Sequence, residues 1–141
     1  MGRQSLTTTD HADGVVTGAV RITMQAEGLA ICAVAILIYF RAEYSWREFA
    51  LLFLVPDLSM LGYLAGRRIG AFAYDVAHSY VGPASLAALA LLIATPAAMP
   101  IALIWVAHIG LDRMLGFGLK YGVGFGYTHL GRVGRASLER T

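Results

Sequence analysis

Four long apolar stretches, separated by short polar turns, dominate the pattern of residues along the chain. They cover residues 20–40, 49–66, 69–94 and 98–119. The continuous apolar run in the first stretch, Leu29 to Phe40, is only about 18 Å long as a helix, so this helix must begin near Val20 to cross a bilayer core of roughly 30 Å. None of the stretches alternates apolar and polar residues as a half-buried strand does. The pattern predicts an all-α fold: a polytopic membrane protein whose four transmembrane helices form a bundle.

Polar residues mark the two ends of the chain. Residues 1–17 lack the basic start and apolar core of a signal peptide, so we expect a flexible polar tail there. Residues 18–120 form the expected membrane domain. Residues 121–141 are basic and rich in glycine, without the lysine motif of a phosphate-binding loop. We interpret them as a flexible cytoplasmic segment at the membrane surface, although such a segment can also fold back over the mouth of a cavity.

Composition narrows the class of protein. Of the 141 residues, 57% are hydrophobic and 14% are charged, whereas about a quarter of the residues in a soluble domain are charged. The single cysteine, Cys32, lies in an apolar stretch and excludes a disulfide framework. The net charge of +2 is too small to indicate nucleic-acid binding, and the C-terminal arginines suit anionic lipid head groups instead. The expected partner is therefore the lipid bilayer.

Basic residues predict the orientation of the chain in the membrane. With four spans, both termini and the turn between the second and third spans lie on the same side. That side carries eight basic residues: Arg3, Arg21, Arg67, Arg68, Lys120, Arg132, Arg135 and Arg140. The opposite side carries only Arg41 and Arg47. Because cytoplasmic loops are rich in Lys and Arg, both termini are predicted to lie in the cytoplasm, with the protein in the bacterial inner (plasma) membrane.

Ionisable residues fall inside all four apolar stretches, at similar distances from the basic ends. They are Glu27, Asp57, Asp75, His78, His108, Asp112 and Arg113. At 1.5 Å per residue, the acidic and histidine side chains lie roughly 9 to 18 Å from the cytoplasmic ends of their helices. Charged side chains at this depth are costly in lipid, so they should face the interior of the bundle. We expect them to converge in its cytoplasmic half.

Two pairs among these residues have helical spacing. Asp75 and His78 are three residues apart and His108 and Asp112 are four apart, so each pair is expected on one face of its helix. Two imidazoles and two carboxylates that face one another are suitable ligands for zinc, manganese or iron. The same groups can instead form a hydrogen-bond network that only joins the helices. The sequence thus predicts either a divalent metal site or a structural polar network. At the metal site, His78, His108 and Asp112 would be ligands, and Asp75 would be a fourth ligand or a carboxylate that supports them.

The predicted catalytic set consists of Asp57, Glu27 and Arg113. Pro56 lacks an N–H and its ring displaces the carbonyl of Leu52, so it should break the second helix beside Asp57. Asp57 or Glu27 would be the general base, and Arg113 would stabilise negative charge that develops in the reaction. A salt bridge between Arg113 and one of these carboxylates is the structural alternative.

Three other residues are candidate accessory groups: Lys120, His129 and Tyr74. If the C-terminal segment folds back, Lys120 and His129 would approach the polar site from its cytoplasmic side. Tyr74 would donate a hydrogen bond, although aromatic packing is the more usual role of a tyrosine in such a helix.

A resemblance to a known family is carried by two runs, LFLVPDLSMLGYLAGRRIGAFAYDVAHSYVGP and WVAHIGLDRMLGFGLKYGVGFGYTHLGR, with Glu27-Gly28 as an opening motif. They resemble an uncharacterised bacterial family of small integral membrane proteins, the domain of unknown function 4260. This resemblance covers roughly residues 20–135 and implies a four-helix membrane protein, without an activity, a cofactor or catalytic residues. More loosely, the order of PDLS, AHSY and HIGLD is similar to motifs of bacterial inner-membrane metal-dependent hydrolases, but the Thr-His element comes late, at Thr128 and His129.

Three functions are consistent with this sequence. The first is a membrane-embedded, metal-dependent hydrolase of a lipid or head group, in which a metal-activated water is the nucleophile. The second is a small transporter or proton-coupled carrier, which would have to form a homo-oligomer because four helices are few for alternating access. The third is a non-catalytic membrane assembly or interaction protein whose polar core is structural.

Overall fold

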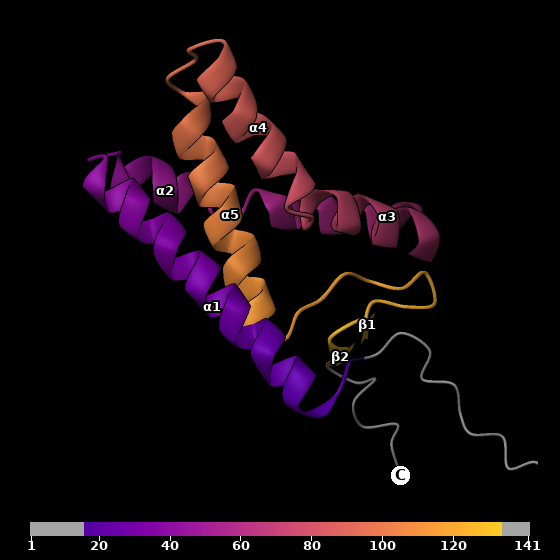
Figure 1. Ribbon diagram of the computed structural model, residues 1–141. Coiled ribbons are helices and arrows are strands. Elements are labelled where there is room, and N and C mark those ends of the chain that lie inside the picture. Colours follow the sequence, from indigo (N-terminus) through magenta and orange to yellow (C-terminus); the bar gives the residue numbers. More distant parts are fainter. Residues whose placement is uncertain (1–15, 134–141) are drawn as a thin grey trace, which may run out of the picture.

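The computed structural model describes residues 16–133, which are mostly helical, as predicted. Figure 1 shows how the elements are arranged. In chain order they are α1 (Gly18–Arg41), α2 (Trp46–Leu52), the 3₁₀ helix η1 (Pro56–Ala65), α3 (Arg67–Ala77), α4 (Val81–Leu92), α5 (Ala98–Leu115), β1 (Tyr127–Thr128) and β2 (Gly131–Arg132). Most of the predicted N-terminal tail, residues 1–15, and residues 134–141 lie outside the described residues.

Helices α1 and α5 form an antiparallel pair at the centre of the molecule (Figure 1). Small residues allow the two backbones to approach closely. A Cβ added to Gly28 would lie 2.9 Å from the carbonyl oxygen of Gly110, and one added to Gly110 would lie 2.8 Å from the backbone nitrogen of Cys32. Cys32 and Ala35 then pack against Ala107 in the core. Close packing of small residues is the usual way in which helices associate in lipid, where no hydrophobic effect drives them together.

The second apolar stretch is interrupted at Pro56, as predicted. The regular helix α2 ends at Leu52, and the Leu52 carbonyl accepts a hydrogen bond from the N–H of Val55 (3.0 Å), because Pro56 has no N–H to donate. The chain then continues as η1, which lies against α3. The break leaves Asp57 in the first turn of η1.

The third apolar stretch differs from the prediction of one continuous helix. Its two parts, α3 and α4, meet at an angle at residues 78–80 (Figure 1). They have 11 and 12 residues, so each is only about 17 to 18 Å long and too short to cross a bilayer alone. Pro83 lies in the first turn of α4, where a missing N–H costs no hydrogen bond. The helix therefore breaks before Pro83.

Three segments of the described chain are long and apolar enough to cross a membrane: 18–41, 46–65 and 98–115. The four-span prediction would require α3 and α4 to cross together. Many large apolar side chains on these elements point outward, among them Leu37, Phe40, Leu61, Leu64 and Leu92. Exposed apolar surface on this scale is typical of a protein surrounded by lipid.

The C-terminal segment is folded where the structure describes it, in contrast to the expected flexible tail. Gly116 ends α5 in the left-handed conformation (φ 88°), and the chain turns back beneath the helices. Strands β1 and β2 pair in antiparallel fashion, and Thr128 and Leu130 are fully buried. The N–H of Val16 donates to the carbonyl of His129 (2.8 Å). The start of α1 and the C-terminal hairpin therefore lie next to each other.

The contact between α1 and α5 yields a test of the fold. Replacing Gly110 with alanine should lower the free energy of unfolding in detergent by about 1–3 kcal/mol, because the new methyl group overlaps the backbone of α1. Gly122→Ala is the matched control, since its Cβ would meet only the Arg68 side chain, at 3.7 Å. Thermal unfolding curves for both variants check this, and equal melting temperatures would contradict the close packing.

Candidate metal centre

Four side chains from three separate parts of the chain meet inside the molecule. Asp57 comes from η1, His78 from the end of α3, and His108 and Asp112 from α5. Each offers one nitrogen or oxygen atom, and these four atoms all lie within 4.8 Å of one another. We call these residues the His/Asp cluster.

The shortest distances in the cluster involve the Nε2 atoms of the two histidines. His78 Nε2 lies 3.2 Å from His108 Nε2 and 3.4 Å from Asp57 Oδ1. Asp112 Oδ2 is 3.5 Å from His78 Nε2, and Asp57 Oδ1 is 3.5 Å from His108 Nε2. Both histidines are buried, whereas 19% of the Asp112 side chain and 32% of the Asp57 side chain are exposed. The cluster is thus closed around the imidazoles and most open at Asp57.

Helices α3 and α5 supply three of the four cluster residues. His108 and Asp112 lie one helical turn apart on the face of α5 that looks toward the cluster, as the i, i+4 spacing predicted. His78 follows the last residue of α3, and its backbone N–H donates to the Tyr74 carbonyl (2.8 Å). Because α3 ends there, the imidazole of His78 is free to turn toward α5.

Tyr74 holds His78 and Asp112 in place. Its carbonyl lies 3.0 Å from Nδ1 of His78, and since a carbonyl only accepts, Nδ1 carries the proton and Nε2 presents its lone pair to the cluster. The Tyr74 ring stacks on the His78 ring, with centroids 3.7 Å apart and planes 7° apart. The Tyr74 hydroxyl donates to Asp112 Oδ2 (3.0 Å). Tyr74 therefore positions two members of the cluster, a larger role than the accessory donor suggested by the sequence.

Asp75 lies outside the cluster, so the structure does not bring it together with His78, His108 and Asp112 as a fourth ligand. Its Oδ1 accepts a hydrogen bond from the backbone N–H of Lys120 (2.6 Å). Only His78 of this i, i+3 pair is among the four residues whose donor atoms meet. Asp75 instead attaches the C-terminal segment to α3, and the second carboxylate of the cluster comes from Asp57.

Glu27 is also separate from the cluster. The buried face of α1 consists of Gly28, Cys32, Ala35 and Tyr39. Glu27 is exposed, since a shift of one position rotates a side chain by about 100° around a helix. The predicted role of Glu27 as a base or ligand at this site is therefore not supported by its position.

Arg113 forms none of the salt bridges considered for it. One of its nitrogens, Nη2, donates to the carbonyl of His78 (3.2 Å), and Nη1 lies 3.0 Å from Nε2 of His129. Among the described residues, no arginine or lysine forms a salt bridge with Asp57 or Asp112. The guanidinium thus joins the end of α3 and the C-terminal hairpin to α5, and both cluster carboxylates lack a basic partner.

Lys120 and His129 approach the site with the C-terminal segment. Lys120 is 4% exposed, and its Nζ lies 3.9 Å from the centre of the Phe125 ring and 4.8 Å from that of Tyr74. Burial lowers the pKa of Lys120, while the nearby aspartates oppose this shift. Burial and the charge of Arg113 both lower the pKa of His129, whose Nδ1 accepts the N–H of Leu119 (2.9 Å). His129 is therefore neutral at pH 7, and both residues close the site on the side of the hairpin.

The Asp75 contact yields a second test. Asp75→Ala removes the acceptor for the Lys120 N–H, so amide hydrogen exchange should become faster in the segment from Leu119 to Leu130. Asp57→Ala is the control and should leave this segment protected. Exchange measured by mass spectrometry in detergent checks the prediction. Unchanged protection in Asp75→Ala would show that this hydrogen bond does not hold the segment.

Comparison with known proteins agrees with the motifs found in the sequence. No curated protein and no solved structure shows significant similarity to the chain. The looser similarity to metal-dependent hydrolases gains no support from these comparisons. The model of one family, the domain of unknown function DUF4260, matches residues 21–133. This range includes all four residues of the His/Asp cluster. It also includes every described helix, apart from the first turn of α1. The protein belongs to the DUF4260 family.

Proposed function

We propose that the protein is a membrane-embedded, metal-dependent hydrolase whose metal ion is held by the His/Asp cluster. The observation that carries this proposal is the convergence of four donor atoms, two of them from carboxylates without a basic partner. His78, His108 and Asp112 are the proposed ligands. Asp57 is the fourth ligand or the base, because it is the most exposed member of the cluster.

The spacing of the donor atoms supports a metal ion of the size of zinc. Ligands bonded at about 2.0–2.1 Å in a tetrahedron lie roughly 3.3–3.4 Å apart. Four of the six distances between the donor atoms are 3.2, 3.4, 3.5 and 3.5 Å, close to these values, and the other two are no longer than 4.8 Å. Manganese and iron accept the same nitrogen and oxygen ligands.

Charge supports the same proposal. Two ionised carboxylates this close repel each other, and burial beside apolar helices strengthens the repulsion. A divalent cation would balance both charges and would use the Nε2 lone pair that Tyr74 directs into the cluster. The structural alternative is a hydrogen bond from His108 Nε2–H to His78 Nε2, which the distance of 3.2 Å allows. It leaves the two carboxylates without a salt bridge to a lysine or arginine, since Lys120 and Arg113 act on Asp112 only from a greater distance.

A divalent ion at this site would supply an acidified water and would polarise an ester or phosphoester group. The protein groups around it have separate tasks in the proposal. As the base rather than a ligand, Asp57 would accept a proton from the attacking water and return it to the leaving oxygen. Tyr74 keeps His78 and Asp112 in position, and Arg113 fixes the end of α3, so it acts in positioning rather than by direct contact with the substrate.

Measurement of bound metal tests the proposal. Protein purified without a histidine tag or chelator and incubated with zinc, manganese or iron should hold about one ion per chain and melt at a higher temperature than the chelated protein. His108→Ala should lose the ion, and Tyr74→Phe should weaken binding by about 10- to 100-fold because it removes an outer hydrogen bond.

The matched control is Asp75→Ala, since Asp75 carries a carboxylate of the same helix outside the cluster. It should keep the ion. A parent protein that binds none of the three metals would refute the metal centre and would leave the structural network. Loss of the ion in Asp75→Ala alone would restore Asp75 as a ligand in place of Asp57.

We also propose that both termini lie in the cytoplasm and that the protein resides in the inner (plasma) membrane, with its basic ends against anionic head groups. The bond between Val16 and His129 supports a common side for the two ends of the described chain. The excess of basic residues on that side supports the cytoplasm.

This orientation is testable with fusions at Thr141 in a bacterial host. A green fluorescent protein fusion should fluoresce, and an alkaline phosphatase fusion, which is active only outside the cytoplasm, should be inactive. The same fusions placed after Ala42, in the turn that follows α1, should give the opposite result. Phosphatase activity at Thr141 would show that the orientation is reversed.

A further inference from the structure

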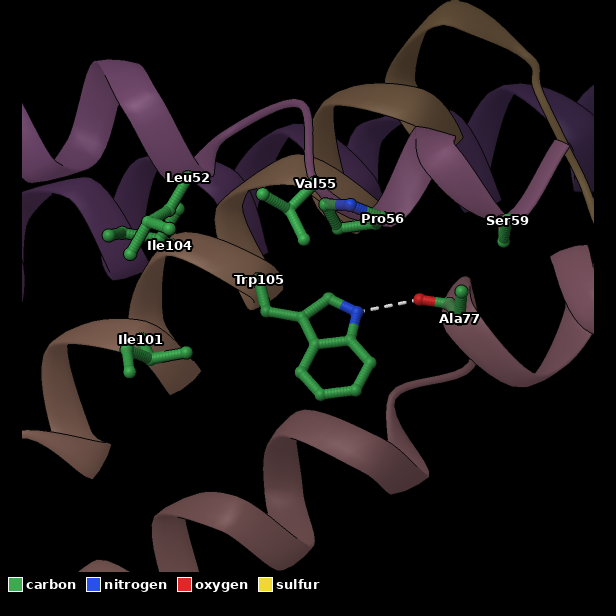
Figure 2. A pocket seen from close by; sticks show the side chains of 8 residues that line it. All are labelled: Leu52, Val55, Pro56, Ser59, Ala77, Ile101, Ile104 and Trp105. Carbon is green, nitrogen blue, oxygen red and sulfur yellow. Dashed lines mark hydrogen bonds between the residues drawn. The ribbon is translucent and has the colours of Figure 1, made fainter. Parts of the chain in front are cut away.

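An apolar cavity of about 290 Å³ lies beside the His/Asp cluster. Its lining comes from two sides of the molecule, as Figure 2 shows. One side consists of the end of α2 and the start of η1, and the other of α5, with the end of α3 between them. The lining residues are Leu52, Val55, Pro56, Ser59, Ala77, Ile101, Ile104 and Trp105.

The cavity and the cluster are formed by neighbouring residues of the chain. Pro56 and Ala77 line it, and the next residues in the chain are Asp57 and His78. Its outer part is reached from the surface of the protein, since Val55 is 47% exposed and Ile101 is 42% exposed. Val55 and Ile101 belong to segments that are apolar enough to cross a membrane. The material that meets the opening in a bilayer is therefore lipid hydrocarbon.

The lining offers almost no partner to a polar ligand. The indole N–H of Trp105 already donates to the carbonyl of Ala77 (2.6 Å), as the dashed line in Figure 2 shows. The remaining polar side chain is Ser59, whose Oγ is buried without a hydrogen-bond partner among the described residues. The volume is at the lower end of the roughly 300–1,000 Å³ of small-molecule sites, which suits one slender chain better than a fused ring system.

We infer that this cavity holds one acyl chain of a membrane lipid and thereby brings the polar linkage of that lipid to the His/Asp cluster. One part of this inference, that acyl lipids are the substrate class of the metal site, rests on the proposed function. The binding of the chain itself depends only on the shape and apolar lining of the cavity.

Photocrosslinking in vesicles tests this inference. The probe is phosphatidylcholine with a diazirine in one acyl chain, and crosslinked residues are identified by mass spectrometry. Ile104 is the decisive residue, since it is 2% exposed and lines the cavity. Crosslinks at Ile104 are expected in the parent protein, whereas a chain outside the cavity would label only exposed positions such as Leu61.

Two variants fill the cavity from different sides, Ala77→Leu and Ile101→Trp. Both should lose the crosslink at Ile104 because the larger side chain occupies the space of the acyl chain. Ala84→Leu and Leu91→Trp are the matched controls, since both positions are exposed on α4 outside the lining. The controls should keep the crosslink.

The outcomes separate this inference from the metal centre. His108→Ala and chelated parent protein should keep the crosslink at Ile104, and Ile101→Trp should keep its metal ion. Absence of the Ile104 crosslink in the parent, or its persistence in both filled variants, would overturn the acyl-chain site whatever the metal content.

Discussion

The hydrogen bond between Nδ1 of His78 and the carbonyl of Tyr74 is the interaction on which the polar centre depends. It determines which nitrogen of His78 faces the other three residues of the cluster. The same tyrosine stacks on His78 and donates to Asp112, so one residue orients ligands on two elements. His78 caps the C-terminal end of α3, and Tyr74 lies one helical turn before it, so both side chains reach the cluster from the same end of this helix.

The breaks in the helices have a cost in a membrane, where free backbone groups find no water. In this protein, nearby donors and acceptors form hydrogen bonds with the backbone groups that the breaks leave free. The Leu52 carbonyl accepts from Val55, and the N–H of Val81 donates to the side chain of Ser79 (3.3 Å). The carbonyl of His78 accepts from Arg113, and that of Ala77 accepts from Trp105. The groups freed at the first break are thus bonded by backbone, and those at the second break by side chains, one of which, Trp105, also lines the cavity.

The two sides of the His/Asp cluster differ in polarity. On the side of the hairpin, Asp75 bonds the C-terminal segment, Lys120 lies over aromatic rings, and Arg113 contacts His129. On the other side, apolar residues line a cavity that is accessible from the lipid-facing surface. A polar cluster closed toward the hairpin, with an apolar cavity next to it, is suited to molecules that arrive from the bilayer. This arrangement unites the two proposals, although each depends on different residues.

The sequence by itself determined the properties that depend on neighbours along the chain. Apolar composition predicted helices, Pro56 predicted the break before Asp57, and the spacing of His108 and Asp112 predicted their common face. The family was also recognisable from motifs. Each of these follows from local geometry, which one helical turn suffices to define.

Only the tertiary structure decided which polar residues meet. Asp75 bonds the C-terminal segment instead of joining the cluster, and Glu27 is exposed because Gly28, Cys32 and Ala35 occupy the face of α1 that contacts α5. The glycine-rich segment was expected to be flexible, but its order comes from Asp75 and Arg113, which lie far away in the sequence. The cavity, too, is formed by residues from separate elements. Contacts of this kind depend on how helices pack, and no local pattern specifies that.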